Sequence, residues 1–210
     1  MNATTLTPST LPIVSDHYRL STYLAIREKA LDMFAEYGFQ AVSLRKLAGA
    51  IGIQPGSLYC HIKNKHALLF ELIEEHENDL FETLKTAIPN GPPCAQLKTY
   101  VWESLIYLTQ HQRQGTVAKH ETRHLREEQQ NNIRALKNKR HSLLRDILRN
   151  YALKKNKQNT EHVEILYQCA TMVLDNFTEC SPHQSETSLH AYRDFIFRCI
   201  DDHLKNTLTR

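Results

Sequence analysis

The sequence lacks the segments that mark secreted and membrane proteins. No early stretch places a charged region before an apolar run, and no apolar stretch reaches the roughly 18 residues that a transmembrane helix needs. The five cysteines are an odd set without a C-x-x-C pair, which argues against a disulfide framework and for reduced thiols. We therefore expect a cytoplasmic protein that neither binds nor crosses a membrane.

The sequence also lacks the strict alternation of apolar and polar residues that predicts β-strands, and it contains no internal repeat. Apolar residues instead recur at three- and four-residue spacing along most of the chain. This pattern predicts an all-α fold of roughly nine helices. With 41% hydrophobic and 23% charged residues among 210, the chain has the composition of a globular protein and enough length to bury a core.

The most informative stretch is 43–69, which predicts two short helices around a turn and the start of a third. Ser43 is a suitable N-cap for the first of them. The apolar residues that follow share one helical face: Leu44, Leu47, Ala48 and Ile51. Gly52 then ends this helix, because glycine adopts a positive φ without a Cβ clash. The second helix is predicted over 55–61, and Pro55 is tolerated in its first turn. Two short helices around a turn, followed by a third, are the arrangement of a helix-turn-helix DNA-binding motif, which we call the reader.

This stretch resembles the DNA-binding region of TetR-family transcriptional repressors. The resemblance rests on R-K-L-A at 45–48, Gly52-Ile53, G-S-L-Y at 56–59, His61 and K-N-K-x-A-L-L at 63–69. It implies a three-helix helix-turn-helix head on a C-terminal helical bundle that binds an effector and forms a homodimer. Residues 16–66 contain seven Lys or Arg against four Asp or Glu, a mild basic bias that suits phosphate contact.

The second helix of the reader carries the expected base contacts. Gln54, Ser57 and Cys60 lie where a recognition helix could face base edges, and the Gln54 amide could pair with an adenine. Pro55 and Gly56 start this helix, and the small side chains of Gly56 and Ser57 let the backbone approach a groove closely. Gln54 replaces the usual capping Ser, and Cys60 is small where relatives often carry a large side chain, so the base sequence cannot be inferred.

Phosphate contacts are expected beside these residues. The resemblance implies this role for Tyr59, His61 and Lys65, and Arg45 is a further candidate near the start of the preceding helix. The alternative is that Tyr59 belongs only to the core and that Lys65 is only a solvated charge. The predicted DNA-binding set is Arg45, Gln54, Pro55, Gly56, Ser57, Tyr59, Cys60, His61 and Lys65.

Composition divides the chain into a tail and two domains. Residues 1–15 are rich in Thr, Ser and Pro and have no period, which predicts a disordered tail. We expect the helix-turn-helix domain over 16–68 and an effector-binding and dimerisation domain over 69–210. The third helix of the reader should continue past Leu80 and link the two, and Pro-Asn-Gly-Pro-Pro at 89–93 is the clearest break.

The C-terminal half is predicted to contain several further helices. One should stop near 114–115, and a helical region over 116–157 should be interrupted, if anywhere, at 129–132. Two final helices are expected over 161–179 and 186–206.

The final two helices carry apolar faces that are wider than a bundle edge requires. In TetR-like proteins such helices pair with their copies, so the resemblance implies a homodimer through about 161–206. The alternative is packing within one chain. With the helices paired in this way, Cys169, Cys180 and Cys199 are expected to be small buried hydrophobes and not redox sensors.

Residues 112–157 hold thirteen Lys or Arg against four Asp or Glu. Three interpretations remain open: a solvated helix face balanced by the acidic stretch 71–79, an entrance for an anionic effector, or direct DNA contact. The cations expected at such an entrance are Lys119, Arg123, Arg126 and Arg134. The C-terminal half also looks, more loosely, like the regulatory domains of TetR-type proteins that sense acyl-coenzyme A.

His120-Glu121-Thr122-Arg123-His124 matches H-E-x-x-H, the pattern that places two zinc ligands one helical turn apart with a glutamate as general base. Against a zinc enzyme, Arg123 puts a cation between the would-be ligands, and the surroundings are polar. No downstream motif positions a third ligand, although His111 and His141 exist. A chance match is favoured, so no catalytic group, metal or cofactor is expected.

These patterns together predict a homodimeric repressor that binds a near-palindromic double-stranded DNA operator and is released by a small-molecule effector, with an anionic or acyl-type effector as a candidate. One alternative is a TetR-like DNA-binding protein that acts through a protein partner without an effector. The other is the zinc metalloenzyme built on His120, Glu121 and His124.

Overall fold

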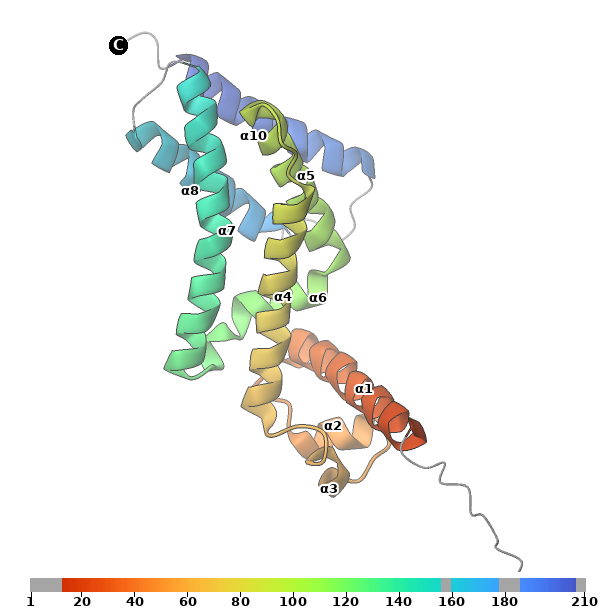
Figure 1. Cartoon of the computed structure of the whole chain (residues 1–210). Helices are drawn as coiled ribbons and strands as arrows, with labels where there is room; N and C mark the ends of the chain where they lie inside the picture. Colours follow the sequence, from red (N-terminus) through yellow and green to blue (C-terminus); the bar gives the residue numbers. More distant parts are fainter. Residues whose placement is uncertain (1–12, 156–159, 178–185, 207–210) are drawn as a thin grey trace, which may run out of the picture. The chain divides into compact units, whose positions relative to one another are not determined.

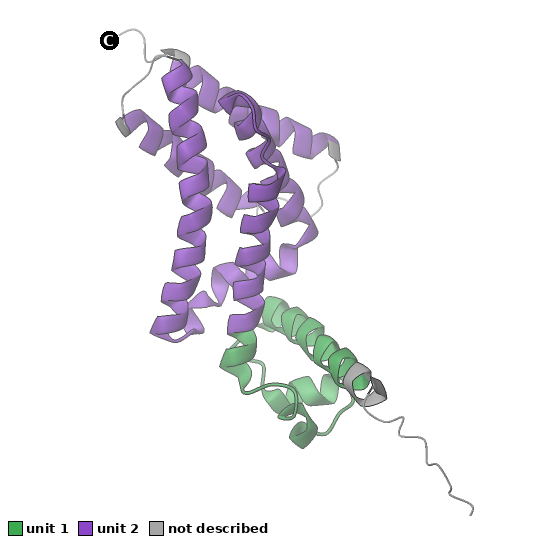
Figure 2. Ribbon diagram, viewed as in Figure 1, with its two compact units in different colours: residues 1–69 green, residues 70–210 purple. Residues whose placement is uncertain are grey.

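The structure is a computed structural model that describes residues 13–155, 160–177 and 186–206 (Figure 1). Within these residues the chain forms nine α-helices and one short 3-10 turn, without a strand, so the all-α prediction is confirmed. The chain divides into two compact units, 1–69 and 70–210 (Figure 2). None of the described helices combines the length and the apolar character that a membrane span requires.

Unit 1 holds α1 (Ile13–Tyr37), α2 (Leu44–Ala50), α3 (Pro55–Leu58) and the start of α4 (Lys65–Ala87). The predicted tail is therefore wrong for 13–15, which belong to α1, whereas 1–12 lie outside the described residues. Helix α1 packs against α2, and α2 packs against α3. Fully buried apolar side chains from these helices and from the loop between α1 and α2 form the core of the unit: Ile26, Ala30, Phe34, Phe39, Leu47, Ala48, Leu58, Leu68 and Leu69.

Both predicted caps of α2 are present. The Ser43 Oγ accepts a hydrogen bond from the Lys46 N–H at 3.1 Å, which satisfies a free donor of the first turn. Gly52 has a φ of +74°, and the Ile53 N–H donates to the Ala48 carbonyl at 3.0 Å, the closure that follows a left-handed residue. Local chemistry thus fixes both ends of α2.

Helix α3 is shorter than predicted. It ends at Leu58 instead of 61, because the chain then turns with hydrogen bonds between residues three apart, from Cys60 N–H to Ser57 O and from His61 N–H to Leu58 O. The turn leads into α4, whose cap is Asn64: its Oδ1 accepts from the Ala67 N–H at 2.8 Å. The predicted recognition segment, 55–61, is therefore one helical turn followed by a tight turn.

Unit 2 holds the rest of α4 and six further elements. They are α5 (Pro93–Gln110), α6 (Gln112–His120), the 3-10 turn η1 (Thr122–His124), α7 (Glu127–Lys154), α8 (Thr160–Asp175) and α10 (Glu186–Asn206). Helix α5 packs against both α7 and α10, and α7 packs against α8. One hydrophobic core results, with Leu97, Tyr100 and Leu105 of α5 and Leu144 and Leu148 of α7 fully buried.

Two predicted helix breaks in unit 2 are wrong. The break expected at 114–115 occurs at His111, which has φ −117° and ψ 40°, and Gly115 lies inside α6. The break expected at 129–132 occurs at 121–126 instead. There the Gln129 side chain reaches back to accept from the Arg126 N–H at 3.2 Å, so residues that look like a polar interruption form the capped first turn of α7.

The two glycines around the end of α2 should respond to alanine in opposite ways. Gly52→Ala should lower the free energy of unfolding by about 1–2 kcal/mol, because a Cβ disfavours positive φ. Gly49→Ala, in the helix and with nothing within 4 Å of the added Cβ, should raise it by about 0.5–1 kcal/mol. Urea unfolding followed by circular dichroism measures both. Equal effects of the two changes would contradict the assigned cap.

Candidate functional site

The predicted DNA-contact residues gather around α3, and most of them are exposed. Exposed side chains or backbone belong to Arg45, Gln54, Gly56, Ser57, Tyr59 and Cys60, whereas Pro55, His61 and Lys65 are half-buried. Leu58 is fully buried but Tyr59 is 61% exposed, so the alternative that Tyr59 belongs only to the core is wrong. The one-turn helix anchors itself through Leu58 and leaves its polar neighbours available to a ligand.

Three residues of α1 lie beside this set, and sequence reasoning missed them. Tyr18, Arg19 and Thr22 line a hollow of about 380 Å³ together with residues of the reader: Ile53, Ser57, Cys60 and His61. Tyr18 is 69% exposed, and Arg19 is also exposed. No local motif could have indicated them, because only tertiary packing brings α1 beside α3. The exposed Arg19 guanidinium places a further cation on this face, a group that suits phosphate contact.

Lys65 has a structural role in unit 1. Its Nζ donates hydrogen bonds to the carbonyls of Phe39 and Val42, both at 2.8 Å, and lies 4.0 Å from the centre of the Phe39 ring. Burial lowers the pKa of Lys65, since a desolvated ammonium is less favourable. The ammonium therefore ties the loop between α1 and α2 to the start of α4, and the solvated-charge alternative is wrong. Its predicted phosphate contact stays a prediction.

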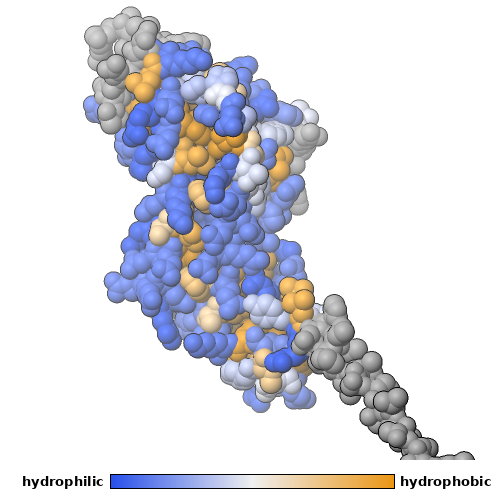
Figure 3. All heavy atoms as spheres, viewed as in Figure 1, coloured by the Kyte–Doolittle hydropathy of each residue, from blue (hydrophilic) through white to orange (hydrophobic). Residues whose placement is uncertain are grey.

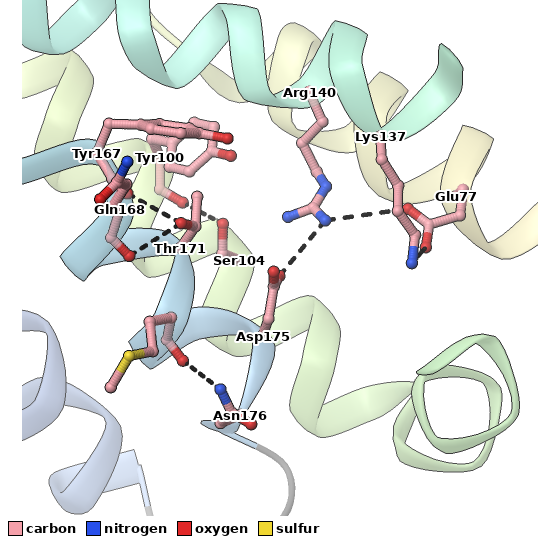
Figure 4. Close-up of polar contacts among 11 residues, drawn as sticks. Glu77, Tyr100, Ser104, Lys137, Arg140, Tyr167, Gln168, Thr171, Asp175 and Asn176 are labelled. Atoms are coloured by element: carbon pink, nitrogen blue, oxygen red, sulfur yellow. Dashed lines mark hydrogen bonds and ion pairs between the residues drawn. The ribbon is translucent and has the colours of Figure 1, made fainter. Parts of the chain in front are cut away.

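A buried ion cluster lies in unit 2 (Figure 4). The Arg140 side chain of α7 is 7% exposed, and its Nη2 lies 3.5 Å from Asp175 Oδ1 of α8 and 4.0 Å from Glu77 Oε2 of α4. The Lys137 Nζ lies 3.3 Å from Glu77 Oε1. Burial alone would lower the pKa of Arg140, but nearby Tyr100, Glu77 and Asp175 outweigh it and hold this pKa above its usual value.

A cavity of about 230 Å³ opens beside this cluster, between α4, α5, α6, α7 and α8. Its polar lining is His76, Glu77, Lys119, Lys137, Arg140 and Asp175. Three buried atoms in that lining have no hydrogen-bond partner within the described part of the chain: His76 Nδ1, Glu77 Oε2 and Arg140 Nε. Buried polar groups are normally paired with protein groups or ordered water, so these three atoms leave hydrogen bonds that water or a small polar molecule would complete.

The basic block 112–157 divides between this cavity and the surface. Lys119, Lys137 and Arg140 line the cavity, whereas Arg123, Arg126 and Arg134 do not. An entrance that draws an anion by the field of these cations stays a prediction. Other cations of the block form ion pairs with carboxylates on neighbouring helices. Arg145 pairs with Glu164 of α8 at 3.1 Å, and Lys155 pairs with Asp201 of α10 at 3.2 Å. Figure 3 shows mainly hydrophilic side chains over α7 on the visible face. Most of the block is therefore a solvated helix face.

The H-E-x-x-H pattern does not lie on one helix. Helix α6 ends at His120, and η1 follows, so the two histidines are not one turn apart on a continuous α-helix. The His124 Nε2 lies 3.3 Å from Glu121 Oε2, the would-be general base. Across the described ranges, no group of three or more His, Cys, Asp or Glu side chains is placed to hold a metal ion. The zinc alternative thus lacks the helical geometry that it requires.

An apolar groove of about 270 Å³ lies between α8 and α10. Ile165 and Phe195 line it while 41% and 60% exposed, and both groove cysteines, Cys169 and Cys199, are exposed. Packing within one chain therefore does not bury these two cysteines, so their burial at a dimer interface stays a prediction, and Cys180 lies outside the described residues. Each lies on the outer face of its helix, where helical spacing alone does not distinguish a core from an interface.

Two buried histidines of unit 2 should make stability depend on pH. Burial, followed by the charges of His111 and Arg140, lowers the pKa of His76 to about 3, and burial with Arg140 lowers that of His141 to about 4. The unfolded chain takes up these protons near pH 6.5, so the stabilisation is complete above that pH and is lost on acidification.

We expect the free energy of unfolding to fall from pH 6.5 towards pH 4 by up to about 1.4 kcal/mol per pH unit for each of the two residues. His76→Gln should flatten this dependence, and the exposed His120→Gln should not. Urea unfolding at several pH values measures both slopes. An unchanged slope in His76→Gln would contradict the buried neutral histidine.

Comparison with known proteins agrees with this architecture. A family model described as bacterial regulatory proteins of the tetR family matches residues 26–72, and one described as the tetracyclin repressor-like C-terminal domain matches 90–177. The transposon Tn10 TetC protein of Escherichia coli is 36% identical over 73 residues, which are 34% of this chain and 37% of that protein. The repressor KstR2 of Rhodococcus jostii is 36% identical over 62 residues, 30% of each chain. The chain thus spans about a third of the length of the curated relatives that it matches.

Solved structures share the fold over nearly the whole chain. A TetR-family transcriptional regulator from Bordetella parapertussis matches with a TM-score of 0.77 at 19% identity, covering 90% of this chain and 98% of that one. AibR, solved in complex with isovaleryl coenzyme A and operator DNA, matches with a TM-score of 0.73 at 19% identity, covering 84% and 96%. The family models for the DNA-binding and C-terminal domains and the fold shared with solved structures all indicate one family. The chain belongs to the TetR family of bacterial transcriptional regulators.

Proposed function

We propose that the protein is a ligand-responsive transcriptional repressor that binds a near-palindromic operator as a homodimer. The observation that carries this proposal is the capped helix-turn-helix of unit 1, which exposes Gln54, Ser57 and Cys60 on the recognition segment. Members of the family are transcriptional regulators and not enzymes. The broken H-E-x-x-H pattern supports the same conclusion.

On DNA, the recognition segment enters a major groove and the surrounding residues hold the phosphates. Gln54, Ser57 and Cys60 face base edges, with the Gln54 amide suited to adenine. Tyr59 and Arg19 extend from exposed positions towards the backbone on either side of that segment. Lys65 contributes mainly by fixing the loop to the start of α4, since two of its donors are already used.

The apolar groove between α8 and α10 is the proposed dimer interface. Two copies related by a two-fold axis bury the exposed Ile165 and Phe195 and cover Cys169 and Cys199. Such a dimer presents two identical readers to successive major grooves, whose centres lie roughly 34–36 Å apart. The operator is therefore expected to contain two inverted half-sites.

An effector bound in unit 2 regulates DNA binding through α4. This helix begins at Lys65 in the reader, and further along it supplies His76, Glu77 and Leu80 to the wall of the cavity. A shift of α4 that favours one state by about 1–3 kcal/mol changes the affinity for DNA by 5- to 150-fold. The cavity supports this mechanism over a regulator without an effector. AibR provides a parallel, as a structure of that protein holds both an acyl-coenzyme A and operator DNA.

Substitutions on the DNA face should separate positioning from specificity. Arg19→Ala should weaken binding to all sequences and lower the slope of log affinity against log salt by about 0.9, the value for one phosphate contact. Gln54→Ala should weaken the free energy of binding to the preferred site by about 1–3 kcal/mol, and that to random DNA by less. Fluorescence anisotropy with DNA fragments from upstream of neighbouring genes measures both effects. Arg149→Ala, at an exposed position of unit 2, is the matched control. If the unmodified protein shows no preference over random DNA at physiological salt, the proposal is wrong.

The dimer interface is tested by charge insertion into the groove. Phe195→Glu should convert the dimer to a monomer at micromolar concentration, because a desolvated carboxylate would face its symmetry copy. Leu153→Glu changes a side chain that is 48% exposed on α7 and does not line the groove, so it should leave the dimer intact. Light scattering distinguishes the two results. A monomeric unmodified protein would refute the interface.

A further inference from the structure

The cavity beside Arg140 is small, and its size limits what can bind. Its volume of about 230 Å³ compares with roughly 30 Å³ for one water molecule, which leaves room for roughly seven to ten non-hydrogen atoms. Drug-sized ligands occupy roughly 300–1,000 Å³. A coenzyme A thioester is far larger than this space. The cavity therefore suits a compact molecule.

The charges that line the cavity favour an anionic group. Lys119, Lys137 and Arg140 supply three positive charges, and Glu77 and Asp175 supply two negative charges. The Arg140 guanidinium is poorly satisfied, because its Nη2 donates to Asp175 over 3.5 Å and its Nε has no partner among the described groups. A carboxylate placed against Nε would complete a charge-assisted pair in a desolvated site.

The same cavity also offers acceptors. Glu77 Oε2 is buried and accepts no hydrogen bond from any described residue, and it lies 4.0 Å from the guanidinium. His76 is neutral at physiological pH, so its unpartnered Nδ1 accepts or donates according to the tautomer. A ligand that carried only a carboxylate would leave Glu77 facing another anion. A hydroxyl or amino donor on the ligand removes this conflict.

The remaining residues that line the cavity are apolar, and one of them is a glycine. Leu80, Leu108 and Ala118 supply apolar surface to the lining, which suits a short hydrocarbon segment of a ligand. Gly115 of α6 also lines this space, and a Cβ added there would lie 4.0 Å from His76 Nε2. A methyl group therefore fits at Gly115, whereas a branched side chain would project into the cavity.

We propose that this cavity binds a small hydroxy- or aminocarboxylic acid, whose carboxylate pairs with Arg140 and whose donor group bonds to Glu77. The acid is the effector of the repressor only if the proposed function holds, so this part of the assignment rests on that function. Arg140 lies on α7 and Glu77 lies on α4, so the ligand bridges these two helices. In the unliganded chain the Lys137 to Glu77 ion pair of 3.3 Å links the same helices, and the ligand replaces that link with its own.

Calorimetric titration of the full-length protein tests the ligand class. The probes are 3-hydroxybutyrate, 4-hydroxybenzoate and 4-aminobenzoate, each compared with its carboxamide. At least one acid should bind, and its amide should bind at least tenfold more weakly because it carries no charge. No binding by any of the three acids, or equal binding by acid and amide, would overturn the proposal.

Two matched variants at Gly115 test the location without altering a charged residue. Gly115→Leu should fill the cavity and lower the affinity for the bound acid at least tenfold, whereas Gly115→Ala should retain affinity within about threefold. Both changes favour the helix, so the variants should fold. Retained affinity in Gly115→Leu would place the ligand elsewhere and overturn the assignment.

DNA binding provides the separate readout. If the proposed function holds, the unliganded protein prefers its operator, and the bound acid weakens this preference in the wild type but not in Gly115→Leu. A protein that binds the acid but shows no DNA preference refutes the proposed function and leaves the ligand site standing. Operator binding that responds to stearoyl coenzyme A equally in wild type and Gly115→Leu, with none of the acids bound, refutes the ligand class and leaves the repressor standing.

Discussion

The buried Arg140 is the constraint on which unit 2 depends most. A guanidinium that is 7% exposed is costly unless carboxylates surround it, and here they come from α4 and α8 while the arginine comes from α7. The three helices must therefore meet at this point. The hydrophobic core could tolerate small shifts between them, because apolar contacts are not directional. The ion cluster is directional, and its incomplete hydrogen bonding is the basis of the ligand site that we propose.

Unit 1 solves a similar problem with one lysine. The loop between α1 and α2 leaves the carbonyls of Phe39 and Val42 without helical partners, and the Lys65 ammonium satisfies both at 2.8 Å. Because the reader is held by this contact, by the caps of α2 and by Leu58, its outward side chains are not needed for folding. Gln54, Ser57 and Cys60 can therefore differ between relatives without loss of the scaffold.

Local signals predicted local features well. Ser43, Gly52 and the helical periods gave the caps, the all-α class and the last helix, because each depends on residues a few positions apart. The misplaced breaks in α6 and α7 show the limit. A single glycine such as Gly115 costs a helix only about 1 kcal/mol, and the polar run at 129–132 is compatible with a helix, so tertiary packing decides both. The cavity could not be predicted, because Arg140 and Asp175 are 35 residues apart in sequence and only packing brings them together. The same holds for Arg19 beside Ser57.

The shortness of α3 has a consequence for how much sequence one reader can distinguish. A helix of four residues followed by a turn presents only a few side chains to the bases, each worth about 1–3 kcal/mol of discrimination. A genome offers about 10⁶–10⁹ competing sites, so one such segment discriminates too weakly to select one specific site among them. Two copies on one duplex multiply their selectivities. In the proposed dimer, the second subunit would therefore supply accuracy as well as affinity.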